Sequence, residues 1–146
     1  MKMDRAELEA FLDTEFPQMR SMQYRIESWD GRLLRMAMPV GEQNLRPGGT
    51  VSGPTMMAMA DCAAYLLILG LIGPVALAVT TNLNINFLRK PGLDDLIAEA
   101  TMLKLGKSLA ICEIALHSAG QDAGPVAHAV LTYAIPPASP PAAKPA

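Results

Sequence analysis

Apolar and polar residues alternate with two different periods along this chain, and the change of period marks its elements. Residues 4–16 carry apolar side chains at helical spacing, which predicts an N-terminal helix. From Met22 the period is two, which predicts a strand, a turn at Asp30-Gly31 and a returning strand that reaches Val40. The first third of the chain is therefore expected to form a helix followed by a β-hairpin.

The middle of the chain is one continuous apolar segment that predicts a long helix. It begins at Pro54, because proline is favoured in a first helical turn, and it ends at the stop pair Gly73-Pro74. Residues 56–72 are about long enough to be the shortest of membrane spans. However, Asp61 lies inside this stretch and no basic residues flank it. We therefore expect the buried core helix of a soluble domain, with no membrane contact.

After this helix the period of two returns and predicts four strands separated by turns. They are expected at Val75 to Leu88, Ile97 to Leu105, Leu109 to Ser118 and Val126 to Ile135. A single α+β domain is predicted over residues 1–136, with a curved antiparallel sheet of five to six strands wrapped around the one long central helix. Because such a sheet has exposed edges, pairing with a second copy is expected. Residues 137–146, rich in Pro and Ala, are expected to be a disordered tail.

Composition narrows the class of protein further. The chain has 146 residues, of which 51% are hydrophobic, enough for one domain with a substantial core. A net charge of -2 argues against a nucleic-acid partner. Cys62 and Cys112 are expected to be buried free thiols, and with only two histidines no metal site is predicted. The first residues contain acids and no apolar leader, so a cytoplasmic location is expected.

Asp61 is the strongest candidate for a functional residue. Its neighbours in the long helix are almost all apolar, and burying an unpaired carboxylate among them costs several kcal/mol. An ionisable group in such surroundings is often part of a functional site. The alternative is a structural role, in which Asp61 pairs with an Arg or Asn.

Two further segments carry candidate polar groups. The glycine-rich loop from Arg46 to Pro54 leads into the helix N-terminus, where free N–H groups can hold a negative oxygen. A tight turn without function is the alternative. On the following strand, Thr80 and Asn82 belong to a polar row, with Asn84 and Asn86, that is expected to share one face. That row either lines a site or faces solvent.

Together these segments resemble the PaaI-like hotdog-fold acyl-CoA thioesterases of the 4-hydroxybenzoyl-CoA thioesterase superfamily, over roughly residues 32–135. In that family a Gly-x-x-His-Gly-Gly segment leads into the central helix, and an Asp follows nine positions after the His. This chain reads Gly-Thr-Val-Ser-Gly-Pro over residues 49–54, and Asp61 stands nine positions after Ser52. The stretches TTNLNINFLRKPG and LGKSLAICEIAL also look like their family counterparts.

The resemblance implies that Asp61 acts as general base or nucleophile on an acyl-CoA thioester. It implies that the Gly53 N–H polarises the carbonyl and that Thr80 helps hold the water, with Asp61 and Thr80 supplied by different subunits. Ser52 occupies the position of the family His and is grouped with the catalytic residues, although it could cap the helix instead.

The resemblance also implies a set of substrate-binding positions. Arg46 aligns without a gap with a family Asn, whereas Asn44 aligns with it only after a two-residue insertion. The second family glycine is Pro54 here, which donates no N–H. The full set is Asn44, Arg46, Pro54, Asn82, Arg89, Lys90, Lys107 and Ser108.

The implied reaction is hydrolysis of an acyl-CoA to a carboxylic acid and CoA. It requires no cofactor, because coenzyme A is part of the substrate. The implied assembly is a homodimer or a dimer of dimers with sites at the subunit interface. The alternative is a non-catalytic hotdog module that binds acyl-CoA or an acyl ligand.

Overall fold

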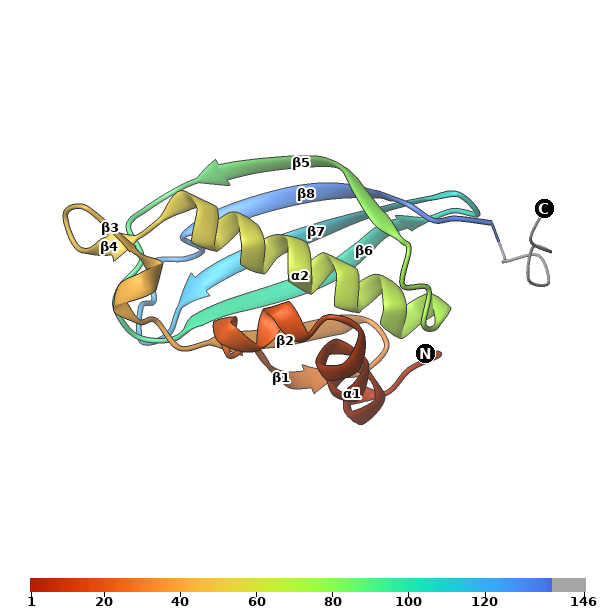
Figure 1. The fold of residues 1–146 in the computed structure, drawn as a ribbon. Coiled ribbons are helices and arrows are strands. Elements are labelled where there is room, and N and C mark those ends of the chain that lie inside the picture. Colours follow the sequence, from red (N-terminus) through yellow and green to blue (C-terminus); the bar gives the residue numbers. More distant parts are fainter. Residues whose placement is uncertain (138–146) are drawn as a thin grey trace, which may run out of the picture.

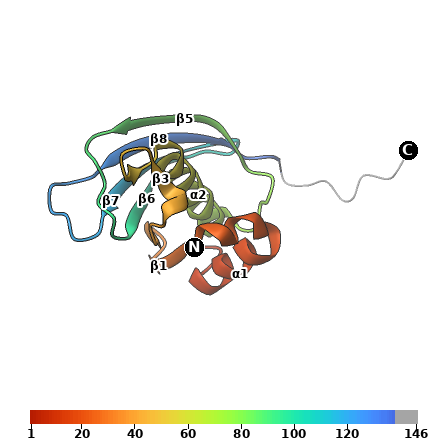
Figure 2. The same cartoon turned by 60° about the vertical axis from the view of Figure 1, so that its left-hand side comes forward.

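The computed structural model describes residues 1–137, so the predicted tail lies outside the described residues apart from its first position. One long helix, α2, lies in the hollow of a curved antiparallel sheet, as Figures 1 and 2 show. The elements are α1 Arg5–Glu15, η1 Pro17–Met22, β1 Arg25–Trp29, β2 Leu33–Met38, η2 Glu42–Asn44, β3 Leu45–Arg46, β4 Thr50–Val51, α2 Gly53–Ile72, β5 Val79–Phe87, β6 Leu96–Leu105, β7 Leu109–Ser118 and β8 Ala127–Ala134.

The main sheet has six strands in the order β1-β2-β6-β7-β8-β5, and β3 pairs with β4 in a small separate hairpin. All neighbours in the main sheet are antiparallel, so β1 and β5 are its two edges. This is the hotdog architecture of the α+β class, as the sequence predicted. The helix expected over 4–16 forms as α1, which contacts both β1 and α2.

The central helix is apolar on every side, which explains why it occupies the interior. By length and composition α2 could cross a membrane, but 72% of its most apolar stretch is buried inside this fold. The strands cover one side of it, and its contact with β1 is close at Gly70. A Cβ at Gly70 would lie 2.7 Å from the Trp29 ring. The glycine therefore allows the indole to lie directly against the helix.

Three parts of the prediction need correction. The first strand does not begin at Met22, because Pro17 to Met22 form a 3₁₀ turn and Gln23 is left-handed with φ 56°. No element was predicted between Val40 and α2, but this segment contains η2 and the β3–β4 hairpin. The strand expected from Val75 begins only at Val79, because the preceding residues form a turn.

Candidate active site

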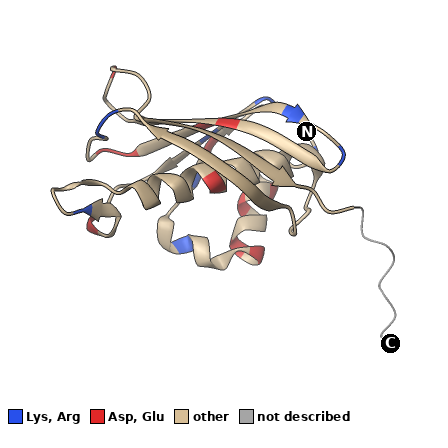
Figure 3. Cartoon of the chain, turned by 90° about the horizontal axis from the view of Figure 1, so that it is seen from above, with Lys and Arg blue, Asp and Glu red and all other residues tan. Residues whose placement is uncertain are grey.

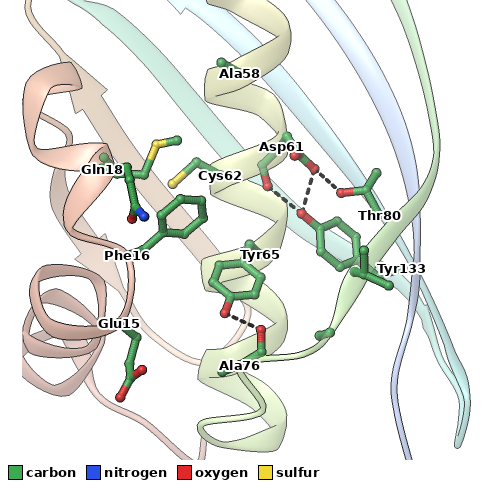
Figure 4. Close-up of a pocket in the computed structure, with 13 residues that line it drawn as sticks. Glu15, Phe16, Gln18, Ala58, Asp61, Cys62, Tyr65, Ala76, Thr80 and Tyr133 are labelled. Atoms are coloured by element: carbon green, nitrogen blue, oxygen red, sulfur yellow. Dashed lines mark hydrogen bonds between the residues drawn. The ribbon is translucent and has the colours of Figure 1, made fainter.

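The Asp61 carboxylate is held by two hydroxyl groups from neighbouring strands (Figure 4). The Thr80 hydroxyl on β5 donates a hydrogen bond to Asp61 Oδ1 at 2.6 Å. The Tyr133 hydroxyl on β8 donates to the same Oδ1 at 2.6 Å and to the Asp61 main-chain oxygen at 3.0 Å. Asp61 is half-buried on α2, so its side chain is anchored and still borders a cavity.

An irregularity in β5 aims Thr80 at Asp61. The pairing of β5 with β8 shifts by one residue between Thr80 and Asn82. After the shift, Leu83 and Ile85 pack against the core, whereas Asn82 is exposed. The expectation that Thr80 and Asn82 share one face is therefore wrong, because a β-bulge reverses the alternation between them. The exposed asparagines face away from Asp61, and the structure does not place Asn82 in this site.

The structure also corrects the origin of Thr80. The resemblance implied that Asp61 and Thr80 come from different subunits. The 2.6 Å hydrogen bond joins them within one chain. The Asp61 carboxylate and its two hydroxyl partners therefore all come from one chain.

Tyr133 was missed as a site residue, although the sequence contains a signal for it. In β8 the inward positions are Ala127, Ala129, Leu131 and Tyr133, all buried. Tyr133 is the one inward residue of this strand with a polar end, and a buried tyrosine hydroxyl normally finds a partner. The alternation along the strand could therefore have pointed to it.

A cavity of about 430 Å³ opens beside these groups. Its walls include Phe16 and Met19 from the segment after α1, Cys62 and Tyr65 from α2, and Ala78 before β5. Figure 4 shows Asp61, Thr80 and Tyr133 on one side of this space and Phe16 with Gln18 on the other. A mostly apolar cavity with a carboxylate in its wall can hold an apolar group and bring one polar atom of the same ligand to the carboxylate.

Neither cysteine is suited to act as a nucleophile. Both are free and buried, as the sequence predicted. Burial, followed by the nearby Asp61 charge, raises the pKa of Cys62 to about 12. The same two causes raise the pKa of Cys112 to about 12. Both thiols are therefore protonated at neutral pH, although Cys62 borders the cavity.

The helix N-terminus is built as a capped turn. Ser52 is the N-cap: its Oγ accepts a hydrogen bond from Thr55 N at 3.2 Å and lies 2.8 Å from Thr55 Oγ1. The structure thus gives Ser52 the capping role. Asn44 is buried, and its Oδ1 accepts a hydrogen bond from Gly41 N at 2.8 Å. Asn44 therefore stabilises the loop that positions Gly53.

Three predicted basic residues gather near this helix end. Arg46, Arg89 and Lys90 border a second hollow of about 380 Å³, together with Gly53. All three are exposed, and the Arg89 guanidinium also donates to the main-chain oxygen of Pro125. Positive charge therefore lies next to the N–H groups of the first helical turn.

The remaining predicted residues are not brought to Asp61. Pro54 is exposed in the first turn of α2. Lys107 and Ser108 form the β6–β7 turn and border a separate apolar hollow with Ile72, at the far end of the helix. Ile72 is eleven residues from Asp61, which corresponds to about 16 Å along the helix axis. Within one chain these two residues are therefore remote from the site.

Charged side chains are otherwise scattered. Figure 3 shows Lys and Arg distributed over several elements of the described chain, interleaved with Asp and Glu. Across the sheet, for example, Arg35 lies 2.9 Å from Glu27 and 3.4 Å from Glu99. Among residues 1–137, no three His, Cys, Asp or Glu side chains are grouped so that they could hold a metal ion.

Comparison with known proteins identifies the family. The model of the thioesterase superfamily matches residues 48–124, more than half of the chain. The chain belongs to the thioesterase superfamily. The match begins in the loop before α2 and includes Asp61 and Thr80.

Solved structures agree with this assignment. A protein of Silicibacter sp. TM1040, described as a candidate thioesterase, is 45% identical, with 92% of each chain covered and a TM-score of 0.82. Mouse thioesterase superfamily member 2 shares the fold at 20% identity, with 93% of this chain and all of that chain covered and a TM-score of 0.80. In sequence, a protein of Thermoplasma acidophilum described as a candidate esterase is 26% identical over 97 residues, which is 66% of this chain and 73% of that protein.

Proposed function

We propose that this protein hydrolyses acyl-CoA thioesters and that Asp61 is the reacting carboxylate. The supporting observation is the position of Asp61 in the wall of a mostly apolar cavity, with two hydroxyl donors on one of its oxygens. Asp61 Oδ2 accepts no hydrogen bond from residues 1–137, and the side chain is half-buried beside the cavity, so this oxygen is available to a water or a substrate.

The proposed chemistry uses this oxygen as a general base. Asp61 takes a proton from water, and the oxygen of that water attacks the thioester carbonyl carbon. The resulting tetrahedral intermediate collapses when the carbon–sulfur bond breaks. CoA leaves as a thiolate and receives the proton from Asp61, and the carboxylic acid remains. Direct attack by the carboxylate is the other route by which the same group could act.

An oxyanion donor is needed as well, and the N–H of Gly53 is the candidate. It lies in the first turn of α2, where N–H groups are not used within the helix. Eight residues separate Gly53 from Asp61, which corresponds to about 12 Å along the helix axis. Both groups must lie within about 3 Å of the same reacting centre. We therefore propose that Gly53 of a second copy completes each site.

The edge strand β5 offers a place for that second copy. Within residues 1–137 it has no neighbour on its outer side, and Val79 and Phe87 at its two ends are about half exposed, at 57% and 50%. Unpaired strand edges of this kind readily pair with another chain. A homodimer, alone or as part of a dimer of dimers, would cover this edge.

The hollow beside Gly53 is the proposed site for the CoA moiety. Arg46 and Lys90 place positive charge there and form no salt bridge with the other described residues, and the CoA phosphates are anionic. An acyl group in the Asp61 cavity and phosphates at Arg46 and Lys90 would place the thioester between them when two copies are combined. A cytoplasmic location, where acyl-CoA is made and used, is expected for this activity.

The experiment is a steady-state assay of CoA release with short, long and aromatic acyl-CoAs, and with the matching oxygen esters. The proposal predicts turnover of at least one thioester by the wild type and a large loss in Asp61→Asn. Thermal stabilisation by acyl-CoA without turnover of any substrate would instead identify a binding module.

A further inference from the structure

Tyr133 holds both the side chain and the main chain of Asp61. Its hydroxyl reaches Asp61 Oδ1 at 2.6 Å and the Asp61 main-chain oxygen at 3.0 Å. One phenol thereby fixes the carboxylate relative to its own backbone. Thr80 is a second donor to the same Oδ1. One carboxylate oxygen therefore accepts two hydrogen bonds, and the other accepts none from the described residues.

The sheet register brings these donors together. Thr80 and Tyr133 are direct partners in the β5–β8 pairing, immediately before the bulge. Side chains of directly opposed residues lie about 5 Å apart on the same face. The two hydroxyls therefore converge on one point of α2, and neither can be moved without disturbing the register of the edge strand.

Tyr133 remains a donor under all ordinary conditions. Burial, followed by the hydrogen bond to the Asp61 carboxylate, raises the pKa of the Tyr133 hydroxyl far above its usual value. The phenol is therefore protonated throughout the working pH range. It can donate to the carboxylate, but it cannot remove a proton from water.

The ring of Tyr133 is itself held in place. It stacks on the Tyr65 ring at a centroid distance of 6.3 Å and an interplanar angle of 29°. The Tyr65 hydroxyl donates to the main-chain oxygen of Ala76 at 2.9 Å, which fixes the turn before β5. Phe16 packs edge-on against Tyr65 at 6.2 Å. The phenol thus has a rigid aromatic support that reaches the N-terminal segment.

We propose that Tyr133 is a positioning residue for the reaction: with Thr80 it fixes Asp61 Oδ1 and thereby assigns Oδ2 as the oxygen that accepts the proton from water. This inference rests on the proposed function. Without the phenol, Oδ1 loses one of its two donors and the carboxylate is free to rotate.

The test is Tyr133→Phe, which keeps the ring and its stacking and removes only the hydroxyl. We expect kcat to fall by about tenfold to a hundredfold, the range for a hydrogen bond to a charged group, while KM changes by less than about threefold. The melting temperature is measured alongside, to show that the variant is folded.

Tyr24→Phe is the matched control. The Tyr24 hydroxyl is also buried but has no hydrogen-bond partner among the described residues. Its removal therefore tests the effect of losing a buried hydroxyl that does not contact Asp61. Its kcat and KM are expected to equal those of the wild type. Equal kcat in wild type and Tyr133→Phe would overturn the proposal, as would the same kinetic loss in Tyr24→Phe.

A second arm does not depend on activity. The orientation of the Asp61 carboxylate is compared in crystal structures of the wild type and of Tyr133→Phe. We expect the carboxylate to rotate or to adopt more than one orientation in Tyr133→Phe, and a single unchanged orientation contradicts the proposal. If the wild type hydrolyses no thioester, the proposed function fails, while this comparison still decides whether Tyr133 positions the carboxylate.

Discussion

Gly53 and Asp61 lie on the same helix, eight residues apart, with the first at its N-terminus and the second in its middle. That separation corresponds to about 12 Å, too far for both to act on one carbonyl group from a single chain. The Thr80 hydroxyl, by contrast, lies 2.6 Å from Asp61 Oδ1 within the chain. In a site shared by two subunits, one copy therefore supplies the helix N-terminus, and the other supplies the carboxylate with its hydroxyl partners.

Mixing two inactive variants tests this division. Gly53→Pro removes the proposed oxyanion N–H at the first helical position, where proline is tolerated. It is expected to lower kcat by about a hundredfold or more, the usual effect of losing one such donor. When Gly53→Pro and Asp61→Asn chains are mixed and allowed to exchange, each mixed dimer has one intact site. Activity is expected to return to about a quarter of the wild-type value per chain.

Mixtures of each variant with itself serve as controls and should stay inactive. Size-exclusion chromatography with light scattering checks that the chains associate and exchange. An active mixture that contains only monomers, or exchanged dimers without recovered activity, would contradict a shared site.

Substitution of Thr80 tests the second donor on Asp61. Thr80→Val keeps the shape of the side chain and removes the hydroxyl, so kcat is expected to fall by about tenfold or more. Thr80→Ser keeps the hydroxyl and should retain most of the activity. Measurement of kcat and KM for both variants decides the point, since equal rates for Val and Ser would mean that the hydroxyl has no part in the reaction.

The two cysteines allow a prediction on pH. Their pKa values are raised to about 12, so each thiol is protonated at every pH well below that value. Because the thiolate is the reactive form, neither cysteine of the native protein is expected to react with an aromatic disulfide reagent between pH 7 and 9. Both should react once the protein is unfolded in guanidinium chloride. Rapid labelling of the native protein at pH 7, followed by peptide mapping to Cys62, would refute this assignment.

The contact of Trp29 with Gly70 predicts an effect on stability. Alanine has a higher helix propensity than glycine, so Gly70→Ala alone would favour the helix by about 1 kcal/mol. The added methyl would lie 2.7 Å from the Trp29 ring, however, and overpacking of this kind costs about 1–3 kcal/mol. We expect a net decrease in the free energy of unfolding, measured by urea denaturation. In a Trp29→Ala background, the same change should be neutral or stabilising.

Much of the fold could be predicted because its strongest signals are local. The apolar run ending at Gly73-Pro74 indicated a largely buried helix, and regular alternation marked the strands on either side of it. Asp61 stood out for the same reason, as a charge within that run. The hairpin at Asp30 followed from its turn residues: Asp30 Oδ1 accepts from the N–H groups of Arg32 and Leu33, both at 2.8 Å.

The predictions that failed concern positions where the assembled sheet, and not the local alternation of polar and apolar residues, decides which way a side chain points. The bulge after Thr80 moves Asn82 to the opposite face, and nothing in the run Thr-Thr-Asn marks where one residue is added to the register. The contact between Thr80 and Asp61 within a chain depends on how β5 crosses α2, which is a property of the assembled sheet. Tyr133 stood 72 residues from Asp61, a separation that no local pattern can link.

The most direct test of the central claim is the rate of thioester hydrolysis by Asp61→Asn, which keeps the size of the side chain and one acceptor oxygen but replaces the other oxygen with an NH2 group that cannot act as a base. With the best acyl-CoA found for the wild type, kcat is expected to fall by about a hundredfold to ten-thousandfold at an unchanged melting temperature. A folded Asp61→Asn protein that retains wild-type kcat would show that Asp61 is not the reacting carboxylate.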